Sequence, residues 1–258
     1  MLKPQNGLAV VLCAALGTQW AALHPDIRNR FTLAPGVRRQ AYAGTMQVVE
    51  RSAIGWLIAR LIAFTHVLPA VRARGVPFEF NLAAAPGVPL GAAWIKERLY
   101  RFAGGVFAFR SVMRLLPDGQ LIEQFPWGLG MRIRLGVGGE AGDTLYFRDD
   151  GYFLALGGWR LPLPRGCTVG RFTLAHRNTG SDAFDIDIRL DHPLLGRLFY
   201  QRGSFTGASA CAAAPADCPG EARTGARETA YWPPPPYASG RLRLLPCAPA
   251  LRRRRPDR

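Results

Sequence analysis

The clearest pattern of hydrophobic and polar positions lies between Asp182 and Phe205. From Phe184 to Asp191 apolar and charged residues alternate strictly, and a second aromatic-rich run follows a turn that contains proline and glycine. Successive side chains of a strand point to opposite faces, so this segment predicts a β-hairpin with one apolar face and one charged face.

The same alternation recurs along most of the chain. Strands are predicted at residues 41–51, 76–82, 94–100, 105–115, 120–125, 131–137, 144–148, 152–156 and 168–177. Turn signals such as Pro117-Asp118-Gly119 and Asp149-Asp150-Gly151 separate them. A sheet of about ten short strands tends to curl or close. The predicted fold class is therefore mainly β with flanking α-helices (α+β), in an antiparallel curved sheet or barrel-like wrap.

Two apolar segments predict helices. Residues 8–23 have apolar positions at helical spacing and are expected to form one amphipathic helix that ends before Pro25, with a link from Asp26 onward. Residues 53–71 are nearly all apolar, but Arg60 and Pro69 argue against a membrane-spanning helix. Two placements stay open for this helix: packing on the sheet, which is the main interpretation, or lying on a membrane surface.

The composition changes after about residue 206, which divides the chain into two parts. Residues 1–206 are predicted to form a single β-rich domain, and residues 207–258, rich in Ala, Pro and Arg, are predicted to be a disordered tail. Since residues 8–23 are interpreted as a mature helix and not as a signal peptide, we expect a cytoplasmic protein, with peripheral membrane contact as an alternative.

The net charge and the spacing of the cysteines limit the classes of function that the sequence favours. The net charge is +15, yet Lys3 and Lys96 are the only lysines among 33 basic residues. Such a skew is typical of GC-rich coding sequences, whereas phosphate-binding surfaces use lysine freely, so nucleic acid is not an expected partner. The five cysteines form no CxxC pair, which predicts no metal site, and no cofactor is expected. Cys13 and Cys167 lie in apolar surroundings and are expected to be buried.

One polar cluster could carry chemistry. It consists of Asp185, Asp187, Asp191 and His192, which His176 could join from a neighbouring strand. Carboxylates on one strand face can bind a cation or supply an acid–base pair. The main interpretation is nevertheless a solvated strand face on which Arg189 supplies the counter-charge. The Gly-rich residues 136–142 precede a strand and not a helix, so they predict a hairpin turn instead of a dinucleotide site.

Several short motifs follow one another in a characteristic order. They are Leu16-Gly17 with Trp20, Leu23, Pro25 and Arg28; Trp94 with Arg98 and Phe102; Glu123-Gln124-Phe125; Leu161-Pro162-Leu163-Pro164; and Phe184-Asp185-Ile186 followed by His192-Pro193-Leu194-Leu195-Gly196, Tyr200 and Gly203. In this order they resemble the bacterial family catalogued as domain of unknown function 4166, roughly over residues 8–206. The family has no assigned reaction, so the resemblance implies no catalytic residues. Its members stand alone or are joined to a dehydrogenase-like domain, which implies a dehydrogenase-like partner as one alternative.

These observations lead to three hypotheses. If the sheet encloses a cavity, the ligand-binding candidates are Trp94, Arg98, Tyr100, Glu123 and Phe125. The first hypothesis is a non-catalytic binding module for a hydrophobic small molecule or lipid. The alternatives are an accessory domain for an oxidoreductase partner, and a hydrolytic or metal-dependent enzyme that uses Asp185, Asp187 and His192.

Overall fold

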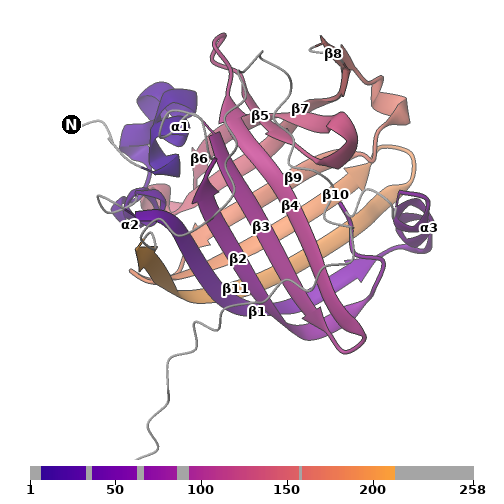
Figure 1. The fold of residues 1–258 in the computed structure, drawn as a ribbon, viewed down its shortest axis with the longest axis horizontal. Helices are drawn as coiled ribbons and strands as arrows, with labels where there is room; N and C mark the ends of the chain where they lie inside the picture. Colours follow the sequence, from indigo (N-terminus) through magenta and orange to yellow (C-terminus); the bar gives the residue numbers. More distant parts are fainter. Residues whose placement is uncertain (1–6, 33–36, 63–66, 86–92, 157–158, 213–258) are drawn as a thin grey trace, which may run out of the picture.

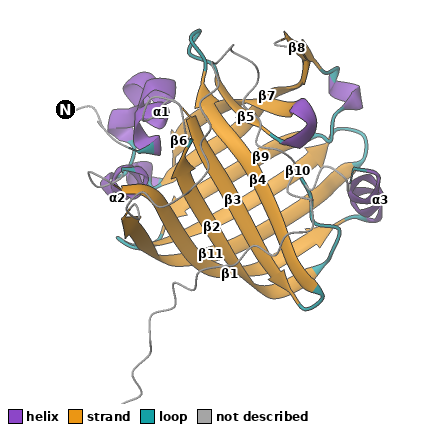
Figure 2. Ribbon diagram, in the orientation of Figure 1, coloured by secondary structure: helices purple, strands orange, loops and turns teal. Residues whose placement is uncertain are grey.

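The first and last strands of the sheet pair with one another, and the sheet closes into a barrel (Figures 1 and 2). The computed structural model describes residues 7–32, 37–62, 67–85, 93–156 and 159–212. In these residues ten antiparallel strands follow one another around the barrel. They are β1 (Val37–Arg51), β2 (Ala73–Ala84), β3 (Ala93–Phe102), β4 (Gly105–Leu115), β5 (Leu121–Gln124), β6 (Leu129–Gly138), β7 (Thr144–Leu156), β9 (Arg171–Asn178), β10 (Ala183–His192) and β11 (Gly196–Ala212).

The predicted fold class is therefore confirmed, and so is the hairpin between Asp182 and Phe205, which forms β10 and β11. The predicted boundary at residue 206 is too early for the strand, because β11 continues to Ala212, which lies opposite Val37 of β1. The remainder of the predicted tail, residues 213–258, lies outside the described residues.

Strand β7 corrects one prediction. The segments 144–148 and 152–156 were expected as two strands separated by a turn, but they form one continuous strand. On β6, Met131 pairs with Tyr152 and Ile133 pairs with Asp149, so one residue of β6 faces two of β7. Gly151 has φ +104°, which glycine adopts without a side-chain clash. The Asp-Asp-Gly sequence is thus a β-bulge and not a turn.

A short strand, β8 (Trp159–Pro162), was not predicted and pairs with the end of β7 outside the ring. The predicted hairpin turn in residues 136–142 is confirmed, since β6 pairs directly with β7 across the short 3₁₀ turn η4 (Glu140–Gly142).

The N-terminal segment folds as three short helices and not as one. They are α1 (Leu8–Leu16), the 3₁₀ helix η1 (Gly17–Ala22) and α2 (Pro25–Phe31). Pro25 begins a helix where it was expected to follow the end of one, because proline suits the first turn and the His24 ring accepts a hydrogen bond from the Asp26 amide (3.3 Å). The predicted link from Asp26 is therefore helical as far as Phe31.

Arg30 of α2 fixes these helices to one end of the barrel. Its side chain is 7% exposed. Its Nη2 donates to Asn178 Oδ1 (2.8 Å) and to the carbonyl oxygens of Gly180 and Ala183 (both 3.1 Å) at the β9–β10 turn. The hydroxyl of Tyr42 on β1 donates to the Arg30 carbonyl (2.7 Å). The apolar faces of α1 and α2 are thereby held against the core beside that end.

Helix α3 (Ala53–Leu61) lies at the outside of the barrel, away from α1 and α2 (Figure 1). It is shorter than the predicted helix 53–71, since residues 67–72 are not helical and residues 63–66 lie outside the described part. Packing on the sheet involves mainly Gly55 and Ala59, which are its buried residues. Among the described residues, no helix has the length and hydropathy needed to cross a membrane.

The expected burial of the two cysteines is not seen. Cys13 on α1 is partly exposed, and Cys167 in the 3₁₀ turn η5 (Arg165–Cys167) is exposed, because that turn lies on the surface.

The contacts of Arg30 predict a large stability loss for Arg30→Leu. The variant leaves carbonyl oxygens of the β9–β10 turn without their donor, and we expect the free energy of unfolding to fall by about 3 kcal/mol. Urea denaturation measures this value. Arg101→Leu is the matched control, since Arg101 pairs with Glu79 on the surface, and its effect should stay below about 1 kcal/mol. Equal losses in both variants would contradict the role of Arg30.

Candidate functional site

A charged cluster lies inside the barrel, where three neighbouring strands meet. On β3 the inward face carries Lys96 and Arg98, because residues two apart share a face. Ser111 lies opposite Lys96 on β4, and Glu123 lies on the next strand, β5. The alternation of three short strands thus brings two cations, one carboxylate and one hydroxyl together.

Glu123 is the centre of this cluster. Its carboxylate accepts hydrogen bonds from Lys96 Nζ (2.6 Å), Ser111 Oγ (2.6 Å) and Arg98 Nη2 (3.2 Å). The residue is 2% exposed. Arg98 also donates to Ser111 Oγ (3.2 Å), and its guanidinium lies over the ring of Phe109, 4.9 Å from the centroid. The cluster is therefore a connected network and not an isolated ion pair.

Burial and charge act on this cluster in opposite directions. Burial alone would raise the pKa of Glu123, but the adjacent Lys96 and Arg98 and the hydrogen bonds it accepts lower that pKa to about 2. Burial lowers the pKa of Lys96 to about 8, with Glu123 opposing this effect and Arg98 adding to it. Near neutral pH all three side chains are charged, and the cluster carries one excess positive charge.

The ammonium group of Lys96 has donors to spare. An ammonium carries three N–H groups, and among the described residues Glu123 is the side chain seen to accept from it. Lys96 is 6% exposed, so bulk water has little access to the remaining donors. Such a group favours an additional acceptor from a bound molecule.

A cavity of about 60 Å³ adjoins the cluster. Besides the charged groups, its lining consists largely of aromatic and aliphatic side chains. These include Phe78, Phe80, Phe147, Phe172, Phe184 and Phe205. The site thus combines an apolar wall with a few converging polar groups, as small-molecule sites do.

A second polar group lines the same cavity nearer to α2. Arg30 Nη1 lies 2.9 Å from Nε2 of His176 on β9, and the ring of His176 stacks on Phe184 (centroids 4.4 Å apart). Burial, and then the charge of Arg30, lower the pKa of His176 well below its usual value of 6.5. The imidazole is therefore neutral at pH 7, and its Nε2 accepts the hydrogen bond from Arg30.

The predicted ligand-binding residues divide into two groups. Arg98 and Glu123 line the cavity. Trp94, Tyr100 and Phe125 are buried in the core beside it. Tyr100 donates to Gln201 (2.9 Å), and Phe125 lies 5.7 Å from Phe109 between ring centroids. These three side chains belong to the core cluster and not to the lining of the cavity.

The predicted aspartate cluster lies on the charged, outward face of β10. Asp185 accepts from Ser204 (2.6 Å), and Asp187 pairs with Arg189 (2.7 Å). Asp191 pairs with Arg197 (3.2 Å). Each carboxylate therefore has a local partner on the hairpin, as expected for a solvated strand face.

The two histidines do not join these aspartates. His192 is buried, and its Nδ1 accepts hydrogen bonds from the amides of Leu194 (3.2 Å) and Leu195 (3.3 Å), which organises the β10–β11 turn. His176 lies inside the barrel with Arg30. In the part of the chain that the structure describes, no group of three or more His, Cys, Asp or Glu side chains could hold a metal ion.

Sequence reasoning missed several residues of the site. Lys96, Ser111, Arg30 and His176 were not among the ligand-binding candidates. A signal existed for Lys96: it is one of two lysines in an arginine-rich chain and shares a predicted strand face with Arg98. The other three carried no local signal, because they become part of the site through pairings far apart in the sequence.

The network around Glu123 predicts a strong effect of Glu123→Gln. The variant leaves two buried cations without a counter-charge, so the free energy of unfolding should fall by about 3–5 kcal/mol. Glu79→Gln is the control, since Glu79 pairs on the surface. The triple variant Lys96→Met/Arg98→Met/Glu123→Met should regain most of the loss, because well-packed apolar groups can replace a buried ion cluster. Wild-type stability of Glu123→Gln in urea denaturation would refute this account.

The pKa shifts predict two steps of acid destabilisation. His176 stays neutral in the folded chain while the unfolded chain binds a proton near pH 6.5, so stability falls as the pH drops below 6.5. The stabilisation from Glu123 is fully present above its usual pKa of 4.5 and is lost as the pH falls toward about 2. Urea denaturation across this pH range measures both steps. In His176→Gln the first step should become smaller, and an unchanged pH profile would contradict the assignment.

Comparisons with known proteins identify the family. The family described as "Domain of unknown function (DUF4166)" matches residues 23–205. No curated protein matches the chain. Rv2717c from M. tuberculosis is 14% identical with a TM-score of 0.35, over 71% of this chain and 98% of that protein. A porin-like protein from Bacteroides uniformis is 6% identical with a TM-score of 0.20, over 67% and 97%. These structural likenesses are too weak to carry an argument, but the family match spans most of the barrel, and the chain belongs to the DUF4166 family.

Proposed function

We propose that the protein is a non-catalytic binding module that holds a compact hydrophobic anion inside its barrel. The observation that carries this proposal is the charge imbalance at Glu123, where one carboxylate faces two buried cations. A carboxylate or similar group on a ligand would accept the spare N–H donors of Lys96 and neutralise the excess charge. Charge-assisted hydrogen bonds of this kind are stronger than those between neutral groups.

The size of the cavity limits the ligand class. At the roughly 30 Å³ that a water molecule occupies in the liquid, 60 Å³ corresponds to about two water molecules. That space takes the carboxylate of a small aromatic or short-chain acid, and the phenylalanine side chains of the lining have to shift to admit its apolar part, since a cavity that binds benzene measures about 150 Å³. Pockets for larger ligands measure about 300–1,000 Å³. A long lipid chain would therefore require the interior to open.

Arg30 supports the same ligand charge from the α2 side of the cavity. Its hydrogen bonds go to His176, to Asn178 and to carbonyl oxygens, all of them neutral acceptors. Arg30 adds to the positive potential of the cavity, although the nearby carboxylates of Asp26 and Asp182 offset part of its charge. An anion is therefore a better occupant than a neutral or cationic molecule. A dehydrogenase-like partner remains a prediction from the family resemblance.

Calorimetric titration with benzoate and hexanoate, and with the neutral benzyl alcohol and hexanol, tests the proposal. We expect the carboxylates to bind and the alcohols to bind at least about tenfold more weakly, because a hydrogen bond to a charged group contributes about 1.5–3 kcal/mol. Carboxylate binding should weaken as the pH rises through about 8, where Lys96 loses its proton.

Lys96→Met is the informative variant, since it leaves the Arg98–Glu123 pair balanced and keeps the apolar length of the side chain. It should fold and lose about tenfold or more in carboxylate affinity. Arg101→Met, on the outer face of the same strand, should bind like the wild type. Absence of carboxylate binding, or equal affinity for the alcohols, would overturn the proposal. Binding of dodecanoate without binding of hexanoate would replace the compact anion by a lipid.

A further inference from the structure

Helix α3 exposes its apolar side chains and buries its small ones. Ile54, Trp56, Leu57 and Leu61 are 43%, 49%, 52% and 68% exposed. A surface helix normally turns its polar residues to solvent. On the outward face of α3, Arg60 is the charged residue. The apolar face therefore needs an apolar environment that the described part of the barrel does not supply.

The orientation of α3 is fixed by its contacts with β11. Ser52 caps the helix by accepting from the Gly55 amide (3.0 Å), and the Ser52 amide donates to the Leu198 carbonyl oxygen (3.3 Å). A Cβ atom at Gly55 would collide with that same carbonyl. Because the helix approaches β11 through Gly55, its opposite side, with Leu57, has to face outward.

Two features of this face suit a membrane interface. The guanidinium of Arg60 lies over the Trp56 ring, 5.8 Å from its centroid. Tryptophan and arginine both place an apolar body in the interfacial layer and a polar end toward water. The β10–β11 turn at the same end of the barrel adds Leu194 and Leu195, which are 87% and 39% exposed.

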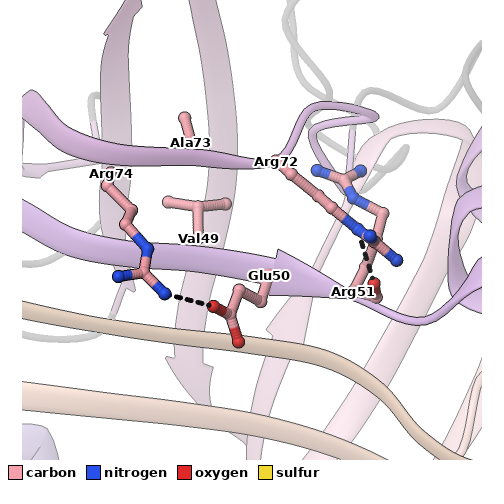
Figure 3. Close-up of a pocket in the computed structure, with 6 residues that line it drawn as sticks. All are labelled: Val49, Glu50, Arg51, Arg72, Ala73 and Arg74. Carbon is pink, nitrogen blue, oxygen red and sulfur yellow. Dashed lines mark hydrogen bonds and ion pairs between the residues drawn. The ribbon is translucent and has the colours of Figure 1, made fainter.

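An arginine-lined pocket lies beside the start of α3 (Figure 3). Its volume is about 480 Å³, and Arg51, Arg72 and Arg74 line it together with Val49, Glu50 and Ala73. Glu50 pairs with Arg74 (3.4 Å). Arg72 Nε donates to the backbone carbonyl oxygen of Arg51 (2.9 Å). Glu50 is the carboxylate among these lining residues, and its partner is Arg74 and not Arg51 or Arg72.

Arg51 is the buried member of this pocket. It is 5% exposed, and its Nη1 donates to the Pro69 carbonyl oxygen. Its Nε and Nη2 have no hydrogen-bond partner in the described structure. Burial and the charge of Arg72 lower the pKa of Arg51 to about 10, which still leaves the group charged at pH 7. A phosphate oxygen would satisfy both nitrogen donors once the Arg51 side chain turns toward the pocket, because both nitrogens are buried in this conformation.

We propose that this end of the barrel docks on an anionic phospholipid membrane, with Trp56, Leu57 and Leu61 in the interface and lipid phosphate at Arg51 and Arg72. Charge complementarity selects this occupant. A second copy of the chain would bring the same arginines together, whereas a lipid surface supplies both apolar depth and phosphate groups.

Co-sedimentation of the full chain with vesicles tests the proposal. The vesicles consist of phosphatidylcholine alone or mixed with phosphatidylglycerol, at low and high salt. We expect binding to the mixed vesicles that weakens at high salt, and little binding to phosphatidylcholine alone. Equal binding to both kinds of vesicle would overturn the role of the arginines.

Matched variants distinguish vesicle binding through α3 from a general electrostatic attraction between the basic chain and the lipid. Trp56→Ser/Leu57→Ser should lose at least about tenfold in vesicle affinity. Trp159→Ser/Leu161→Ser, at exposed apolar residues of β8, should bind like the wild type. Arg72→Gln should lose about fivefold, and Arg101→Gln should lose less. Arginines 252–255 are present in every variant, so their attraction to lipid does not affect the differences in affinity between variants.

Three results would overturn the proposal. The first is equal vesicle binding by the wild type and Trp56→Ser/Leu57→Ser. The second is a dimer in light scattering that this double variant dissociates, which would assign the face to a second copy. The third is calorimetric binding of inorganic phosphate without vesicle binding, which would assign the pocket to a soluble anion.

Discussion

Closure of the sheet is the constraint on which the rest of the structure depends. Strand β1 pairs with β11 from Val37, opposite Ala212, to Arg51, opposite Phe199. This pairing joins the first strand of the sheet to its last. Once the ring is closed, every second side chain of each strand points into an interior that the barrel wall separates from solvent. Inward polar residues must then find partners inside the barrel.

The cluster around Glu123 follows from this closure. In an open sheet, Lys96 and Arg98 could reach water, and their charges would cost little. Inside the ring they depend on one carboxylate, which leaves the interior with an excess of positive charge. Stability and ligand preference therefore both depend on Glu123. Its single carboxylate compensates the two buried cations only in part, and the remaining positive charge favours an anionic ligand.

The strands could be predicted from the sequence because alternation is a local property. It placed Trp94, Arg98 and Tyr100 on one face, and it placed Asp185 and Asp187 on the outward face of their hairpin. Alternation does not say which residues meet across the ring. Arg30 and His176 are 146 positions apart, and no local pattern connects them.

The errors at helices and bulges have physical causes of the same kind. Asp149-Asp150-Gly151 has the composition of a turn, but the pairing of β6 with β7 on both sides turns it into a bulge. The segment 53–71 is apolar enough for a long buried helix. Its hydrophobicity indicates that it needs an apolar neighbour, but it does not indicate whether the barrel provides one, and for most of α3 the barrel does not.

The buried cations of the interior site and the buried cation at the α3 end differ in the number of acceptors that they contact. Lys96 and Arg98 share a carboxylate, and Arg30 donates to four acceptors. Arg51 has a single carbonyl acceptor and two nitrogen atoms without a partner in the described residues. A buried guanidinium in this state carries the full cost of desolvation with little in return. The lipid phosphate proposed at this end of the barrel, where α3 presents its apolar face, would supply the missing acceptors.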